Sequence, residues 1–197
     1  MGNQTIIAVS REFGSGGHII AEKIAKDLGF KYYDRSILDK LAEQHDMDVT
    51  QIEKYDEKPK NRILSKRRGE HSTSLAEHIA QMQFQFLRDK ADSGESFVVV
   101  GRCAETVLKD VPGLITVFVV ADKEDKIRYV MKRHDISESK ATAKIKRHDM
   151  TRKMYHNDHS DFKWGDSRHY DVCINSSRLG FEKTAEVLKE YIKARMK

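Results

Sequence analysis

Residues 6–21, IIAVSREFGSGGHIIA, constrain the fold of this chain more than any other stretch. A short apolar run ends in a polar corner, and a glycine-rich turn then leads into a pattern of helical period that starts at His18. A strand, a glycine loop and a helix in this order present free backbone N–H groups at a helix N-terminus, where they bind anions. The residues expected to bind phosphate in this way are Gly14, Ser15, Gly16, Gly17 and His18.

The loop departs from the best-known phosphate-binding pattern, G-x-x-x-x-G-K-[ST], at two informative positions. Gly17 stands where lysine is expected, and His18 stands where serine or threonine is expected. The first change removes a positive charge at the β- and γ-phosphates, and Arg11, six residues earlier in the same loop, is the candidate replacement. The second change removes the usual hydroxyl ligand of Mg²⁺, for which Ser10 or Ser15 is an alternative. His18 itself is a poor candidate, because Mg²⁺ prefers oxygen to a histidine nitrogen. The sequence therefore leaves the metal ligands unknown.

Strand patterns and helix patterns alternate along the rest of the chain, which predicts a parallel, doubly wound α/β sheet of five strands. The expected strands cover residues 6–9, 30–33, 97–100, 114–120 and 172–174. The expected helices cover residues 18–28, 37–44, 75–91, 105–108, 122–134, 135–158 and 182–194, with Ser72, Thr73 and Ser74 as candidate N-caps of the third. Polar clusters follow four of the strands, at the edge where ligands bind in such sheets.

The length of 197 residues suits one domain over residues 1–197 with small appended parts. One part is a helical insertion over 45–92, which carries a dense basic loop over 56–71 that we expect to be mobile. Three interpretations of this loop stay open. It is a solvated loop, or an arm that closes over a phosphate-bearing substrate, or, with least support, a nucleic-acid contact through residues 58–68. The other part is a basic, mostly helical stretch over 135–160 with few apolar residues, which is a lid candidate.

Composition excludes several classes of protein. A net charge of +5 suits an anionic ligand such as a nucleotide and gives only weak support for nucleic acid. Cys103 and Cys173 are too few for a disulfide framework or a zinc site, and both are expected to be buried thiols at strand ends. No apolar run approaches the ~20 residues of a membrane span, so we expect a cytoplasmic protein. The helix over 75–91 packs either in its own core or on a second copy, which leaves a homodimer possible.

Together these stretches resemble the nucleoside monophosphate kinases, and most closely a divergent bacterial group that is similar to cytidylate kinase. SREFGSGGHIIAEKIAKDLG resembles the glycine loop and first helix of that group, and YYDRSIL resembles the start of its monophosphate side. VVVGRCA resembles the Gly-Arg-Asp turn, IKRHDMTRKMY resembles the arginine-bearing lid, and WGDSRHYDVCINSSRLGFEKTAEVL resembles the terminal strand and helix. The resemblance implies a P-loop kinase fold: a three-layer α/β/α sandwich with strand order 2-3-1-4-5 and a helical lid.

The resemblance also implies a function and roles for particular residues. It implies an ATP-dependent phosphotransferase that uses Mg²⁺ and acts on a nucleoside monophosphate or a similar small acceptor. Arg35 and Arg102 would hold the phosphate of the acceptor, and Asp34 would contact its sugar or a water on Mg²⁺. Arg147 and Arg152 would reach in from the lid and, with Arg11, stabilise the transferring group, because phosphoryl transfer brings two anions together.

The departures from the family pattern support an alternative. Cys103 replaces the acid of the Gly-Arg-Asp turn, which leaves the base of the acceptor open, and Gly17 and His18 remove two groups of the phosphate loop. The alternative is a non-catalytic nucleotide-binding or regulatory protein that keeps the kinase fold. A nucleic-acid-associated protein that uses residues 58–68 is a third hypothesis.

Overall fold

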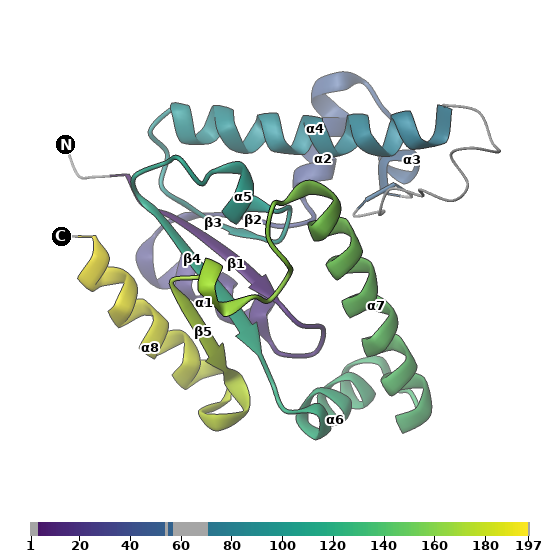
Figure 1. The fold of residues 1–197 in the computed structure, drawn as a ribbon, viewed down its shortest axis with the longest axis vertical. Helices are drawn as coiled ribbons and strands as arrows, with labels where there is room; N and C mark the ends of the chain where they lie inside the picture. The colour runs from purple at the N-terminus through teal and green to yellow at the C-terminus, as the bar shows by residue number, and fades with distance from the viewer. Residues whose placement is uncertain (1–3, 54, 57–70, 197) are drawn as a thin grey trace.

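The computed structural model describes residues 4–53, 55–56 and 71–196. Five parallel strands form one sheet in the order β2-β3-β1-β4-β5, with helices on both of its faces (Figure 1). The strands are β1 (Ile6–Arg11), β2 (Lys31–Tyr33), β3 (Phe97–Val100), β4 (Leu114–Val120) and β5 (Val172–Asn175). The helices are α1 (Gly17–Leu28), α2 (Ile37–His45), α3 (Val49–Glu53), α4 (His71–Asp92), α5 (Ala104–Val107), α6 (Lys123–His134), α7 (Glu138–His159) and α8 (Gly180–Arg195). This arrangement confirms the three-layer fold and the strand order expected from the sequence.

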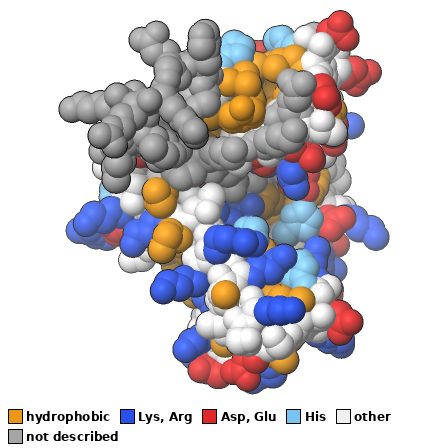
Figure 2. All heavy atoms as spheres, turned by 90° about the vertical axis from the view of Figure 1, so that its right-hand side faces the viewer, with side chains coloured by type: hydrophobic (Ala, Val, Ile, Leu, Met, Phe, Trp, Pro, Cys, Tyr) orange, Lys and Arg blue, Asp and Glu red, His pale blue; other side chains and the backbone are white. Residues whose placement is uncertain are grey.

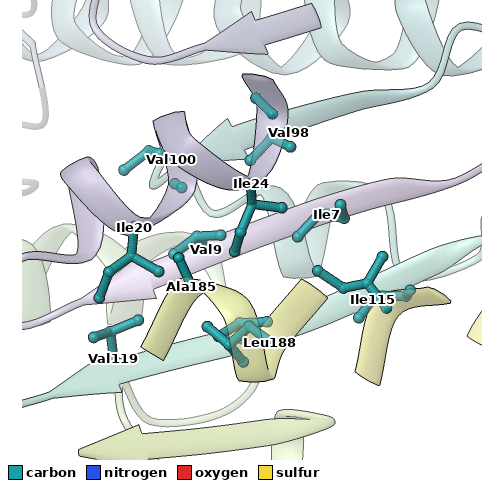
Figure 3. Packing of buried hydrophobic residues seen from close by; sticks show 14 residues of the cluster. Ile7, Val9, Ile20, Ile24, Val98, Val100, Ile115, Val119, Ala185 and Leu188 are labelled. Carbon is teal, nitrogen blue, oxygen red and sulfur yellow. The ribbon is translucent and has the colours of Figure 1, made fainter. Parts of the chain in front are cut away.

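The central strand β1 explains how the three layers are built. Its residues are almost completely buried, because β3 and β4 flank it and helices cover both faces. Ile7 and Val9 point to the face that α1 and α8 cover, where Leu188 of α8 packs beside them (Figure 3). Ile6 and Ala8 alternate to the other face, where α2, α4 and α5 supply the apolar side chains.

Strand β1 is two residues longer than the sequence pattern indicated. Ser10 and Arg11 continue the parallel ladder and pair with Phe118 and Val119 of β4. Arg11 is therefore the last residue of a central strand rather than part of the loop. A polar side chain at this position does not disturb the core, because β1 ends there and Arg11 is only partly buried.

Two further expectations are wrong. Helix α4 begins at His71, so Ser72, Thr73 and Ser74 belong to its first turn and do not precede it as N-caps. The apolar pattern marks only the part of a helix that packs on the core, and this helix extends beyond that part. Cys173 is exposed rather than buried, because β5 is the edge strand of the sheet, whereas Cys103 is buried as expected.

The two appended parts pack as small cores beside the sheet. Ile127 and Val130 of α6 meet Ala141 and Ile145 of α7, so α7 is attached mainly to α6 (Figure 1). On the other side, Ile52 of α3 packs into a separate cluster with residues of α2 and α4. The stretch 135–160 is helical as expected, and its role as a lid stays a prediction.

The basic loop expected over 56–71 lies almost entirely outside the described residues, as do residues 58–68. Among the helices of the described part, none combines the length and the apolar character that crossing a bilayer requires.

Candidate functional site

The glycine loop follows β1 and opens into the first turn of α1. Gly14 and Gly16 have φ values of +86° and +74°, a left-handed conformation that favours glycine. Ser15 Oγ donates to the carbonyl of Glu12 at 2.9 Å, and Ser176 Oγ donates to the carbonyl of Ser15 at 2.7 Å, so the turn is fixed from two sides. Among the described residues, none caps the N-terminus of α1 with its side chain. The backbone N–H groups of this turn are thus directed to bind an anion.

A cavity of about 310 Å³ lies between this loop, the start of α1, and helices α6 and α7. Glu12 is the acidic residue of its lining, and the Nζ atom of Lys126 lies 2.8 Å from Glu12 Oε2. The basic residues of the lining are Arg11, Arg133, Lys144 and Arg152, and the histidines are His18, His134 and His148. Figure 2 shows Lys, Arg and His side chains gathered on the face of the molecule that lies to the right in Figure 1, where α7 runs. This excess of positive charge suits a polyphosphate.

Phe13 docks the glycine loop onto α7. Its ring stacks on His148 with the centroids 4.3 Å apart, and the guanidinium of Arg152 lies 5.5 Å from the ring centroid. The backbone N–H of Phe13 donates to Asp149 Oδ1 at 2.6 Å, and Arg152 Nη1 donates to the carbonyl of Arg11 at 3.3 Å. The loop and α7 therefore form two walls of one cavity.

A cluster of charges behind Phe13 strengthens this docking. The side chain of Lys126 on α6 is nearly buried, and its Nζ atom lies 2.8 Å from Glu12 Oε2 and 3.8 Å from Asp149 Oδ2. Burial raises the pKa of Asp149, and the Phe13 N–H and the Lys126 charge offset part of that effect. Three elements, the loop, α6 and α7, thus meet at one ammonium group.

Arg11 and Gly17 fit together as a pair. A Cβ atom at Gly17 would lie 2.5 Å from Cβ and 3.0 Å from Cγ of Arg11, so the position has no room for a side chain. Counted back from Gly16, Arg11 stands where the phosphate-binding pattern has its first glycine. The cation and a glycine of the pattern have therefore exchanged places. Counting the pattern from its second glycine would have revealed this exchange in the sequence.

Arg102 projects from a strained turn at the end of β3. Gly101, Arg102 and Cys103 all have positive φ, at +75°, +61° and +50°. The left-handed conformation costs a non-glycine residue roughly 1–2 kcal/mol, and such strain concentrates at functional sites. The turn directs a side chain that is only 3% exposed toward the segment that follows α3.

The two arginines expected on the acceptor side meet around one carboxylate. Arg102 Nη1 forms an ion pair with Oδ1 of Asp56. Arg35 Nε lies 3.8 Å from the other oxygen of Asp56, and Arg35 Nη2 lies 3.1 Å from Glu53 Oε1. Arg35 and Arg102 lie 67 positions apart in the chain. Their two guanidinium groups are together called the clamp. Sequence reasoning missed Asp56, because a single acid beside a basic loop carries no recognisable pattern.

His18 is turned toward the end of β2. Its Nδ1 atom lies 3.0 Å from the hydroxyl of Tyr32 and 3.7 Å from Asp34 Oδ2. Burial raises the pKa of Tyr32, which keeps the phenol protonated. Among the described residues, no group of three or more His, Cys, Asp or Glu side chains forms a metal site. Asp34 is a carboxylate at the carboxyl end of β2, and its expected role toward Mg²⁺ stays a prediction.

Helix α7 presents one row of side chains to the large cavity. Lys144, His148 and Arg152 line it at intervals of four residues, as one helical face does. Arg147 is exposed and is absent from this lining, so its expected role stays a prediction. Lys144 and His148 were missed, although their spacing from Arg152 was visible in the sequence.

A small second cavity of about 20 Å³ shares part of its lining with the large cavity. Arg11 and Arg152 line both this cavity and the large one, and Arg102 lines the small one. Glu105 and His156 also lie here, buried, with Oε1 and Nε2 2.9 Å apart. Arg11 and Arg152 therefore stand between the large cavity and Arg102.

A comparison with known families agrees with this geometry. The model of the cytidylate kinase-like family matches residues 6–178. The chain belongs to the cytidylate kinase-like family. No curated protein matches it. Family membership, together with the P-loop kinase fold, supports a kinase-like nucleotide-binding protein of the phosphotransferase class.

Solved structures show the same fold across other sequences. An uncharacterized protein from Eubacterium ventriosum ATCC 27560 is 37% identical, with a TM-score of 0.76, and the alignment covers 96% of this chain and 99% of that one. TT1252 from Thermus thermophilus is 16% identical, with a TM-score of 0.61 and 99% of both chains covered. Shikimate kinase from Bacteroides thetaiotaomicron is 14% identical, with a TM-score of 0.55 and coverage of 96% and 98%. The last two likenesses concern the fold alone.

Proposed function

We propose that this protein is an ATP-dependent phosphotransferase that transfers a phosphoryl group to a nucleoside monophosphate or a similar small phosphorylated acceptor. The observation that carries the proposal is the position of Arg11 and Arg152, which line both the large cavity beside the glycine loop and the small cavity that contains Arg102. In this reaction a phosphoryl group moves from the donor phosphate to the acceptor phosphate, so negative charges are brought close together. Cations at that point stabilise the charge that develops in the transition state.

The large cavity is the proposed donor site. The N–H groups of Gly16, Gly17 and His18 at the start of α1 hold the phosphates of ATP, while Arg133 and Lys144 approach from α6 and α7. Arg11 supplies the charge that lysine supplies in the common phosphate loop. Its guanidinium forms two parallel hydrogen bonds to phosphate oxygens, whereas an ammonium acts as a point charge.

The clamp of Arg35 and Arg102 is the proposed acceptor site. Its two guanidinium groups match the oxygens of one phosphate, and the strained turn at Arg102 fixes the direction of approach. Mg²⁺ neutralises charge on the donor phosphates when it is bound, and Asp34 would hold it directly or through a water. Asp34 is also the proposed contact for the sugar of the acceptor.

The proposal is tested by a coupled assay of ATP consumption with Mg²⁺ and CMP, dCMP, UMP or AMP as acceptor. Arg11→Ala should lower kcat by about 100-fold or more, in the range measured when one preorganised charge-stabilising donor is removed. Arg128→Ala is the matched control, since Arg128 is an exposed α6 arginine outside both cavity linings that pairs with Asp125. Equal activity of the two variants would refute the role of Arg11.

A second candidate function is a nucleotide-binding protein without transfer activity. The contact of His18 with Tyr32 favours it, because that ring is engaged at the position where a Mg²⁺-binding hydroxyl is common. Thermal unfolding with ATP separates the two functions. A rise in Tm with ATP, together with no turnover on any of the four acceptors, supports the non-catalytic protein.

A further inference from the structure

The carboxylate of Asp56 sits where the proposed acceptor site needs an anion. It contacts Arg102 through one oxygen and faces Arg35 through the other, at 3.8 Å from Arg35 Nε. Two guanidinium groups around two oxygens is also the arrangement that binds a phosphate. Asp56 thus makes the contacts that the phosphate of an acceptor would make.

The surroundings explain why an anion is needed there at all times. Arg102 is 3% exposed, and a buried guanidinium without a counter-charge is strongly unfavourable. The turn at residues 101–103 fixes the backbone of Arg102, and the side chain that follows from it is buried. A carboxylate from the chain itself keeps the clamp assembled before a ligand arrives.

Asp56 lies outside the apolar cluster that holds α3. Helix α3 is anchored by Ile52, which is 1% exposed and packs between α2 and α4. Asp56 lies beyond the end of α3, in a turn closed by a 3.3 Å hydrogen bond from its N–H to the carbonyl of Glu53. The side chain can therefore rotate away without disturbing the apolar cluster that holds α3.

We propose that Asp56 is a positioning residue of the acceptor site, which holds Arg35 and Arg102 in place and is displaced by the phosphate of the acceptor. The proposal rests on the proposed function in one respect, because it takes the clamp to be the acceptor site. A phosphate dianion brings one more negative charge to the two guanidinium groups than Asp56 does, while Glu53 stays beside Arg35 at 3.1 Å. Acceptors without a phosphate or a similar dianion are therefore rejected, since they cannot replace Asp56.

This exchange has a measurable consequence. Binding to a site that is open only part of the time weakens the apparent affinity by the open fraction. If Asp56 occupies the clamp about ten times as often as it leaves it, removing its charge strengthens phosphate binding by about tenfold. A residue with a purely structural role would have the opposite effect, because its loss would loosen the clamp.

The experiment measures binding of inorganic phosphate, CMP and cytidine by isothermal titration calorimetry, without ATP or Mg²⁺. Asp56→Asn keeps the shape of the side chain and an oxygen for Arg102 but removes the charge. We expect this variant to bind phosphate and CMP about tenfold more tightly than the unmodified protein. Asp56→Glu should return the affinity toward that of the unmodified protein. Glu43→Gln, which removes an exposed carboxylate of α2 outside the clamp, should change it less than threefold.

Further variants assign the binding to the clamp. The gain of Asp56→Asn should disappear in combination with Arg102→Gln and persist in combination with Lys144→Gln, which alters only the donor cavity. Unchanged or weaker phosphate binding by a folded Asp56→Asn protein would overturn the proposal, as would a gain that survives Arg102→Gln or equal gains for cytidine and CMP. Because no turnover is measured, loss of the proposed transfer activity leaves this test intact.

Discussion

Reversing the exchange between Arg11 and Gly17 is the sharpest test of how this phosphate loop works. The double variant Arg11→Gly/Gly17→Lys restores the order of the common pattern, with glycine first and lysine seventh. In the native chain a Cβ at Gly17 would lie 2.5 Å from Arg11 Cβ, well inside the distance that two carbon atoms tolerate. The two positions must therefore change together.

Each substitution has an expected effect on stability or on kcat. Gly17→Lys alone forces a side chain into filled space and should lower the free energy of unfolding by roughly 1–3 kcal/mol. Arg11→Gly alone should lower kcat by roughly 100- to 1,000-fold, because a charge at the transferring group is lost. The double variant should regain most of the stability lost by Gly17→Lys and at least about tenfold in kcat relative to Arg11→Gly.

Arg11→Ala/Gly17→Lys is the matched control, because alanine keeps the Cβ atom that causes the 2.5 Å contact. Urea unfolding and steady-state kinetics on the same preparations measure the two effects separately. The control should stay as unstable as Gly17→Lys. Additive effects of the two substitutions on stability would refute the steric argument, and a double variant as slow as Arg11→Gly would refute the exchange of the cation.

Three other predictions follow from the structure. Arg152→Ala should lower kcat/KM more than Arg147→Ala in the coupled assay, because only Arg152 lines the cavities, and equal losses would contradict this assignment. Gly16→Ala should lower the free energy of unfolding by about 3 kcal/mol in urea, because φ is +74° and the new Cβ would lie 2.3 Å from the ring of Phe181. Burial disfavours the charged form of Asp171, but hydrogen bonds from Thr116 and Arg195 outweigh it and hold the pKa below its ordinary 3.8. Stability from Asp171 is therefore present above that pH and lost as the pH falls further, so acid unfolding curves should show a smaller pH dependence below pH 3.8 for Asp171→Asn.

The sequence predicted the sheet well because its strands are short, apolar runs that helices cover on both sides. Residues 97–100 and 114–120 were placed without error, since nothing in those runs competes with a buried strand. The N-terminus of α4 and the exposure of Cys173 were not predictable from local patterns. The first depends on how far a helix extends beyond its core-facing part, and the second depends on which strand lies at the edge.

The candidate site was predicted less completely. The glycine loop was found from spacing alone, and the structure places Arg11, Arg35, Arg102 and Arg152 at the cavities or the clamp. Lys144 was missed although its spacing from Arg152 places both on one helical face, whereas Asp56 was missed because its importance comes from contacts between distant segments. No period or spacing marks a residue whose partner lies on another element.

The docking of Phe13 on α7 has a consequence for the exchange of nucleotides. The glycine loop and α7 are already in contact before the proposed nucleotide binds. Less conformational freedom is therefore lost on binding, which strengthens the affinity. The same contacts have to separate before a product of similar size can leave. For the proposed nucleotide ligand, the rate of release would then depend on how often the Phe13 N–H parts from Asp149 and its ring parts from His148.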